Sequence, residues 1–177
     1  DWNERYAQAV EIEKNARLLE STNNADTSAA EKERRSYAVT AASDALLAAQ
    51  SVRGALSNAH NIAYDISVLV KTTSDVSGMS ADVYWAMVEK DEKFAREAEE
   101  RAAEAISKGL HAIDGAQAAL NSTTPDEARD ISRLVLQDLT ITEEHNVRNS
   151  QLAEMVRDDR YTAIGAPLPY DPDTDEP

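Results

Sequence analysis

The residues with the most specific potential chemistry in this chain are its three histidines, because imidazole binds metal ions and haem iron. They are His60, His111 and His145. If the long helices described below run antiparallel, His111 lies about 24 Å along the axis from the other two, at ~1.5 Å of rise per residue. This separation excludes a three-histidine metal site. It leaves two interpretations of His60 and His145, a pair holding haem or two structural histidines, and the second is the simpler.

Other residue patterns that support catalysis are missing from the sequence. No histidine follows a glutamate by three residues, so the Glu-x-x-His pairs of carboxylate-bridged metal bundles are not present. The sequence also contains no glycine-rich phosphate loop and no serine nucleophile elbow. We therefore expect no catalytic residue, no metal site and no cofactor, and a protein that is not an enzyme.

Several polar and aromatic residues fall at inward positions of the expected helices. Polar residues there form either a buried site or, more commonly in long bundles, layers that fix the register of the helices; they are Asp91, Arg101, Asp138 and His145. Aromatic residues should gather at one end of the bundle, where packing of the bundle terminus is a simpler interpretation than a ligand cage; they are Tyr64, Tyr84, Trp85 and Tyr161.

A single motif suggests a modification. Asn121, Ser122 and Thr123 form an N-glycosylation sequon in an expected loop, which is an acceptor if the protein is secreted. The alternative interpretation is an unmodified helix-capping loop.

Charge and composition exclude several classes of partner. The formal net charge is −15, from 33 acidic and 18 basic side chains, which repels nucleic acid and anionic lipid headgroups. The sequence contains no cysteine and no apolar run of transmembrane length. Because it begins at Asp1 without a leader, we expect a mature fragment from which targeting signals were removed.

Apolar periodicity predicts four helices. The first spans residues 2–21, the second runs from about 28 to 71, the third from about 80 to 120, and the fourth from 125 to about 161. The start of the fourth is marked by a capping box, with Thr124 as N-cap, Pro125 at the first helical position and Glu127 three residues after the cap.

The second and third helices share an alanine-rich seam. Small residues recur at alternating steps of three and four from Ala38 to Leu69, and again from Ala81 to Ala119. Two long helices with such faces, joined by a short turn, predict an antiparallel hairpin with closely spaced axes. We therefore predict an all-α fold, an elongated antiparallel helical bundle in which these helices form the central hairpin, with one shorter N-terminal helix and one C-terminal helix.

This layout defines two domains and an exposed tip. The bundle should span residues 1–162, and residues 163–177 should form an acidic, proline-rich extended tail or spacer. The turn at 73–79 and the tail fall at one end of the rod. At the other end the expected exposed tip residues are Asn23, Asn24, Asp26, Thr27, Ser122 and Thr123.

Three stretches carry a family resemblance: "SYAVTAASDALLAAQ", "AREAEERAAEAISKG" and the tail "PYDPDTDEP". The chain resembles the glutamate- and alanine-rich surface protein of African trypanosomes, which is related in architecture to the variant surface glycoproteins. It departs from the variant coat proteins in having no disulfides.

The resemblance implies a non-enzymatic coat protein on the extracellular face of the parasite plasma membrane, held by a glycolipid anchor beyond the C-terminus of this fragment. Its implied partners are the membrane, neighbouring coat proteins and host proteins, with no nucleic acid. Two alternatives remain open: a helical-bundle receptor for a host or nutrient protein, and an intracellular coiled-coil scaffold.

Overall fold

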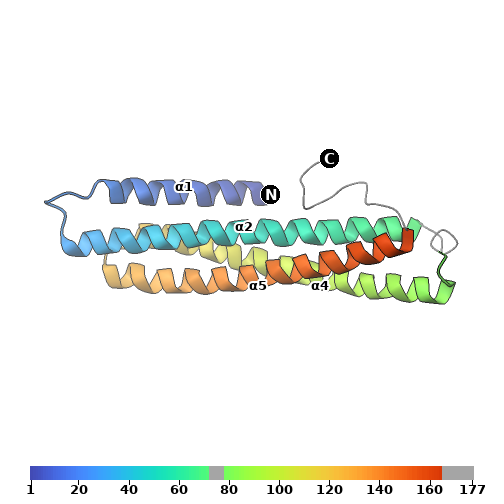
Figure 1. The fold of residues 1–177 in the computed structure, drawn as a ribbon. Coiled ribbons are helices and arrows are strands. Elements are labelled where there is room, and N and C mark those ends of the chain that lie inside the picture. The colour runs from blue at the N-terminus through green and yellow to red at the C-terminus, as the bar shows by residue number, and fades with distance from the viewer. Residues whose placement is uncertain (72–77, 165–177) are drawn as a thin grey trace.

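The computed structural model describes residues 1–71 and 78–164, and these residues form an elongated bundle of helices (Figure 1). The helices are α1 (Trp2–Ser21), α2 (Ala29–Lys71), α4 (Ala81–Leu120) and α5 (Pro125–Ile164). The described residues contain no strand. The predicted all-α bundle is therefore confirmed, and the first three helices have the predicted bounds to within one residue.

Short polar side chains begin these helices as the sequence indicates. Ser28 Oγ accepts a hydrogen bond from the Glu31 amide at 3.1 Å. At α5 Thr124 Oγ1 accepts from the Glu127 amide as the capping box predicts, whereas Glu127 Oε2 accepts from the amide of Thr123, one residue before the N-cap. Helix α5 continues to Ile164, beyond the predicted end near 161, and residues 165–177 of the predicted tail lie outside the described residues.

Contacts distant in sequence define the course of the long helices. Arg34 near the start of α2 donates to the Leu120 carbonyl at the end of α4, while the Tyr84 hydroxyl near the start of α4 donates to the Leu69 carbonyl near the end of α2. Helices α2 and α4 therefore run in opposite directions, and α5 packs along both (Figure 1). The core consists of three long helices, because α5 is as fully integrated as the two helices of the expected hairpin.

The shorter helix α1 covers only part of the bundle. It lies beside the first half of α2 and contacts α4 less extensively (Figure 1). Its first residue, Trp2, donates from Nε1 to the Ala49 carbonyl at 3.0 Å and packs against the cluster formed by Val52, Ala55 and Ala105. This indole fixes the N-terminal end of α1 midway along the rod.

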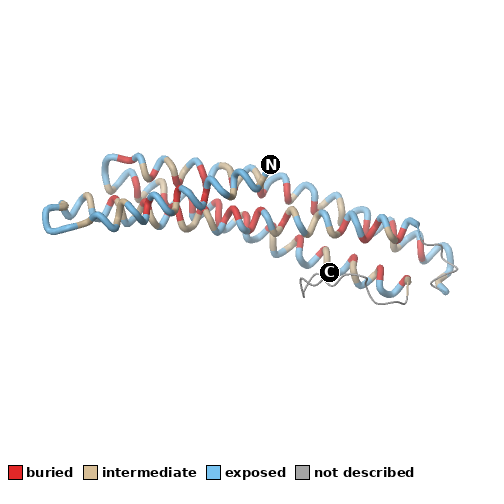
Figure 2. The backbone as a smooth tube through the Cα atoms, turned by 90° about the horizontal axis from the view of Figure 1, so that it is seen from above, coloured by how far each residue is buried: buried red, intermediate tan, exposed pale blue. Residues whose placement is uncertain are grey.

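The buried residues are distributed along the whole length of the rod (Figure 2). Most seam alanines are fully buried, including Ala41, Ala48, Ala105 and Ala112. A close approach of three helices occurs at Gly109, where a β-carbon would lie 2.7 Å from Val52 Cγ2 and 2.8 Å from Trp2 Cη2. A residue without a side chain is required there for α1, α2 and α4 to meet.

Substituting Gly109→Val should therefore lower the free energy of unfolding by about 1–3 kcal/mol, because the added atoms overlap rigid side chains. Urea denaturation measures this change. The control is Ala103→Val at an exposed position of α4, which should cost less than about 0.7 kcal/mol through helix propensity alone. Equal losses in the two variants would contradict the close approach.

Candidate functional site

The loops at one end of the rod are joined by three charged residues at the start of α2. Arg34 Nη1 donates to the Ser122 carbonyl at 2.8 Å, and Arg35 Nη1 donates to Asn23 Oδ1 at 2.8 Å. Glu31 Oε1 accepts from both arginines, from Arg34 Nη2 at 2.6 Å and from Arg35 Nε at 2.9 Å. The tip is therefore a structured surface in which one carboxylate holds the two arginines that fasten both loops.

The predicted tip residues differ in exposure. Asn24, Asp26, Asn121 and Thr123 are exposed, whereas Asn23 and Thr27 are half-buried. Ser122 was expected to be exposed, and that expectation is wrong: the residue is only 5 % exposed. Its hydroxyl donates to the Ala119 carbonyl at 2.6 Å, which turns the side chain back onto the end of α4.

Asn121, the residue of the sequon that would carry a glycan, caps the C-terminal end of α4. Its Oδ1 accepts a hydrogen bond from Gln117 Nε2 at 3.2 Å, and both side chains lie at the surface of the rod. The amide is therefore accessible from solvent at the tip.

The histidines do not converge. His60 is exposed on α2, and His111 pairs through Nδ1 with Asp138 Oδ2 at 2.5 Å. His145 is buried, with Arg101 Nη1 3.2 Å from its Nδ1 and Glu104 Oε2 3.0 Å from its Nε2. Protein side chains thus flank both ring nitrogens of His145, although Nε2 forms no hydrogen bond, and the described residues give no support to a haem-binding histidine pair. Within residues 1–71 and 78–164, no group of three or more potential ligands is arranged to hold a metal ion.

A row of charged side chains lines a small depression of about 240 Å³ between α4 and α5. Glu97 accepts from Arg148 Nε at 2.9 Å and from Arg101 Nε at 3.1 Å. The hydrogen bond from Arg148, followed by that from Arg101, lowers the pKa of Glu97 below its usual range. With His145 and Glu104 continuing the row, the hydrogen bonds and ion pairs between these side chains tie α4 to α5 in one register.

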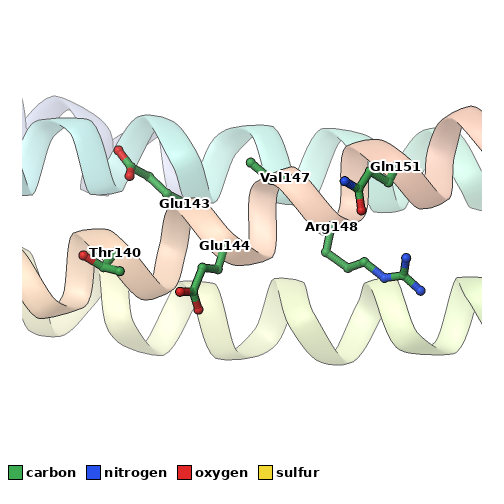
Figure 3. Close-up of a pocket in the computed structure, with 6 residues that line it drawn as sticks. All are labelled: Thr140, Glu143, Glu144, Val147, Arg148 and Gln151. Atoms are coloured by element: carbon green, nitrogen blue, oxygen red, sulfur yellow. The ribbon is translucent and has the colours of Figure 1, made fainter.

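A larger depression of about 450 Å³ lies on the outer face of α5 (Figure 3). All six of its lining residues come from this one helix, and Val147, which is 57 % exposed, is its most apolar member. Glu143 and Val147 extend toward α2, whereas Glu144 and Arg148 extend toward α4 (Figure 3). Because no second helix contributes, the feature is a shallow surface and does not enclose a ligand.

The other end of the rod contains a buried acidic residue, Asp91, beside the half-buried Asp159. Asp91 is fully buried and neither carboxylate oxygen has a hydrogen-bond donor. Burial, and secondly the adjacent Asp159 carboxyl, raise the pKa of Asp91 to about 8. Asp159 in turn lies 2.8 Å from Lys90 Nζ. The raised pKa favours the protonated form of Asp91, because a second negative charge beside Asp159 in the core is costly.

Further polar groups cross the core at fixed levels. Asn149 is fully buried and donates to the Ala55 carbonyl on α2 and to the Ala98 carbonyl on α4, at 3.1 and 3.0 Å. Arg160 donates to Asp65 at 2.7 Å. The predicted burial of Asp91, Asp138 and His145 is confirmed, and Asn149 and Arg160 belong to the same set although their positions were not singled out from sequence.

The fold and these contacts define an elongated all-helical bundle whose buried polar groups join its helices to one another. None of the described helices carries an apolar stretch sufficient to cross a bilayer. Comparison of the chain with protein-family models, with curated proteins and with solved structures gives no significant match.

The raised pKa of Asp91 predicts a specific pH dependence of stability. The unfolded chain releases this proton near pH 4, while the folded chain retains it to about pH 8, so stability falls as the pH rises through this window. Asp91→Asn should remove that decline, which approaches about 1.4 kcal/mol per pH unit for a full proton. Urea unfolding at pH 5, 7 and 9 tests this, with Glu89→Gln on the exposed face of α4 as control. Parallel curves for Asp91→Asn and the unsubstituted chain would refute the assignment.

Glu31 should act in the opposite direction and at lower pH. The hydrogen bond from Arg34, together with that from Arg35, lowers the pKa of Glu31 to about 2. The stability it contributes is present above its unfolded pKa of about 4.3 and is lost as the pH falls toward 2. Glu31→Gln should cost about 1 kcal/mol at pH 7, because the pair is partly exposed, and nothing at pH 2. The control is Glu33→Gln, two residues further along α2 and exposed, which should leave the stability unchanged at pH 7 and at pH 2. A loss of stability at pH 2 for Glu31→Gln would contradict the ion-pair explanation.

Proposed function

We propose that this protein is a non-enzymatic cell-surface coat protein of a parasite, a rod-like ectodomain anchored through its C-terminus that shields the membrane and contacts the host environment. The observation that supports this is the separation of the two ends. The fastened loops at 22–28 and 121–124 occupy one end, and α5 finishes at the other, so a C-terminal tether would direct the loops outward (Figure 1).

A narrow cross-section suits this function. We interpret α2 and α4 as the central hairpin of the antiparallel bundle, and the buried alanines and Gly109 allow their backbones to approach closely. A thin rod occupies little membrane area per molecule, so many copies can stand side by side. The net charge of −15 opposes collapse of neighbouring rods onto one another.

The partners follow from this arrangement. They are the membrane, through a C-terminal lipid anchor outside this fragment, neighbouring coat proteins along the flanks, and host proteins at the tip. A glycan at Asn121 would project from the tip, since its amide is exposed where α4 ends. The acidic surface disfavours nucleic acid as a partner.

A receptor for a host or nutrient protein is the second candidate. It is supported by Leu136 and Val147, which are 51 and 57 % exposed on the outer face of α5. Such a receptor would bind through the flank of the rod and would not require the C-terminal anchor.

Mass spectrometry of the native protein tests the coat function. We expect the peptide that contains residues 165–177 to carry an ethanolamine–glycan remnant, and the peptide that contains Asn121 to carry an N-glycan. The same chain expressed in bacteria is the control for both masses. A free C-terminal carboxylate, or a chain that continues without cleavage, would eliminate the anchored coat and favour the receptor or an intracellular scaffold.

A further inference from the structure

Large apolar side chains are exposed at the end of the rod opposite the tip. We name this set the collar; its members are 49–56 % exposed, and they are Tyr64 and Val70 on α2, Val83 and Trp85 on α4, and Tyr161 on α5. The sequence pattern predicts that the aromatic residues at this end pack the bundle terminus. Tyr84 is buried in this way, whereas Tyr64, Trp85 and Tyr161 leave about half of their surface exposed.

The collar contains every exposed aromatic residue among the described ones. The remaining aromatic residues are half-buried or buried, and they are Trp2, Tyr6, Tyr37, Tyr84 and Phe94. Exposed aromatic surface is thus confined to the end at which α2 and α5 finish and α4 begins (Figure 1). Each of the three long helices contributes, so the collar is not restricted to one face of one helix.

Core contacts hold these residues at similar levels along the rod. Arg160 donates to Asp65 at 2.7 Å, which places the adjacent Tyr161 level with Tyr64. The Arg160 guanidinium also lies 5.5 Å from the centre of the Tyr64 ring. The Tyr84 hydroxyl bonds the Leu69 carbonyl, so Trp85 lies near the level of Val70. From Tyr64 to Val70 the collar spans about 9 Å of helix rise.

These dimensions and this chemistry match a bilayer surface. The headgroup layer on each side of a bilayer is about 5–8 Å thick. Tryptophan and tyrosine are favoured there because each has an apolar ring and a polar group that remains hydrated. A site for a protein partner would be expected as a compact patch on one face, whereas exposed residues on all three long helices at one end of the rod suit a surface that surrounds its base.

The local charge favours a zwitterionic surface over an anionic one. Although the chain as a whole is strongly acidic, the helical segments 61–71, 81–90 and 157–164 are nearly balanced. Their four basic residues are Lys71, Lys90, Arg157 and Arg160, against five acidic ones, Asp65, Asp82, Glu89, Asp158 and Asp159. These helical segments therefore lack the positive excess that recruits anionic lipids, and the acidic residues of the adjoining sequence 165–177 would repel anionic lipids further.

We propose that the collar seats among the headgroups of a zwitterionic lipid bilayer and steadies the rod upright on the membrane. This inference rests on the proposed C-terminal anchorage, which would bring this end of the rod to the bilayer. Lipid anchorage supplies attachment, and the collar supplies orientation, because a tethered rod whose base is seated has less freedom to tilt.

The cysteine-free chain allows a direct test with single-cysteine variants. Val83→Cys reports on the collar, and Leu134→Cys, equally exposed near the tip, is the matched control. Each is labelled with an environment-sensitive dye and tethered by a C-terminal hexahistidine to phosphatidylcholine vesicles that contain a nickel-chelating lipid. We expect a blue shift and quenching by headgroup-labelled lipids at position 83 and neither change at position 134.

The collar itself is then altered. Trp85→Gln combined with Tyr161→Gln should weaken partitioning of the untethered chain into phosphatidylcholine vesicles about tenfold, since two aromatic side chains lose their buried area. Leu134→Gln combined with Leu136→Gln should have no such effect. Circular dichroism confirms folding, and if the collar variant does not fold, the comparison of positions 83 and 134 in the otherwise unaltered chain decides.

Equal dye responses at positions 83 and 134 would overturn the proposal. So would a response at position 83 that needs no vesicles and grows with protein concentration, because the collar would then meet a second copy of the chain. The anchor is tested separately on the native C-terminal peptide. If the native peptide carries an anchor but position 83 gives no dye response, only the collar proposal is rejected. If position 83 responds but the native peptide carries no anchor, only the proposed coat function is rejected.

Discussion

Close approach of the long helices along a seam of small residues is the constraint on which the rest of this structure depends. At Gly109 the side chains of Val52 and Trp2 already occupy the space that a β-carbon would need. Alanine buries little area per residue, so the bundle gains its stability from a long contact and not from a thick core. This long contact between alanine-rich faces produces a rod in which buried positions extend from end to end (Figure 2). A compact domain with a central cavity is incompatible with it.

A uniform seam leaves the register of the helices poorly specified, because sliding one alanine face along another changes little. The buried polar contacts remove this ambiguity. Asn149 bonds one carbonyl on α2 and another on α4, and Arg160 pairs with Asp65 across the same interface. Each would lose its partner after a slip, and an unpaired buried polar group costs about 1–3 kcal/mol. Polar residues thus supply the specificity that alanine cannot.

The two ends of the rod are built differently, and this difference supports the proposed orientation. At the tip, charged groups fasten polar loops through Glu31, Arg34 and Arg35. At the base, amphipathic aromatic side chains are exposed on all three long helices, ion pairs join these helices, and the buried Asp91 has a raised pKa. A hydrated tip and an aromatic base are what a molecule standing on a membrane and facing solvent requires.

The amino-acid sequence by itself determined the helices and most of the core. Periodicity located α1, α2 and α4 to within a residue, and the capping box at Thr124 marked the start of α5, because these signals act over a few neighbouring residues. Only the tertiary structure decided that Ser122 turns inward, that Arg101 and Glu104 flank the ring of His145, and that Tyr64, Trp85 and Tyr161 remain exposed while Tyr84 is buried. Each of these outcomes depends on how far one helix is rotated about its axis relative to its neighbours. That rotation is set by packing between residues distant in the chain, such as Val52 against Gly109, and short-range patterns do not encode it.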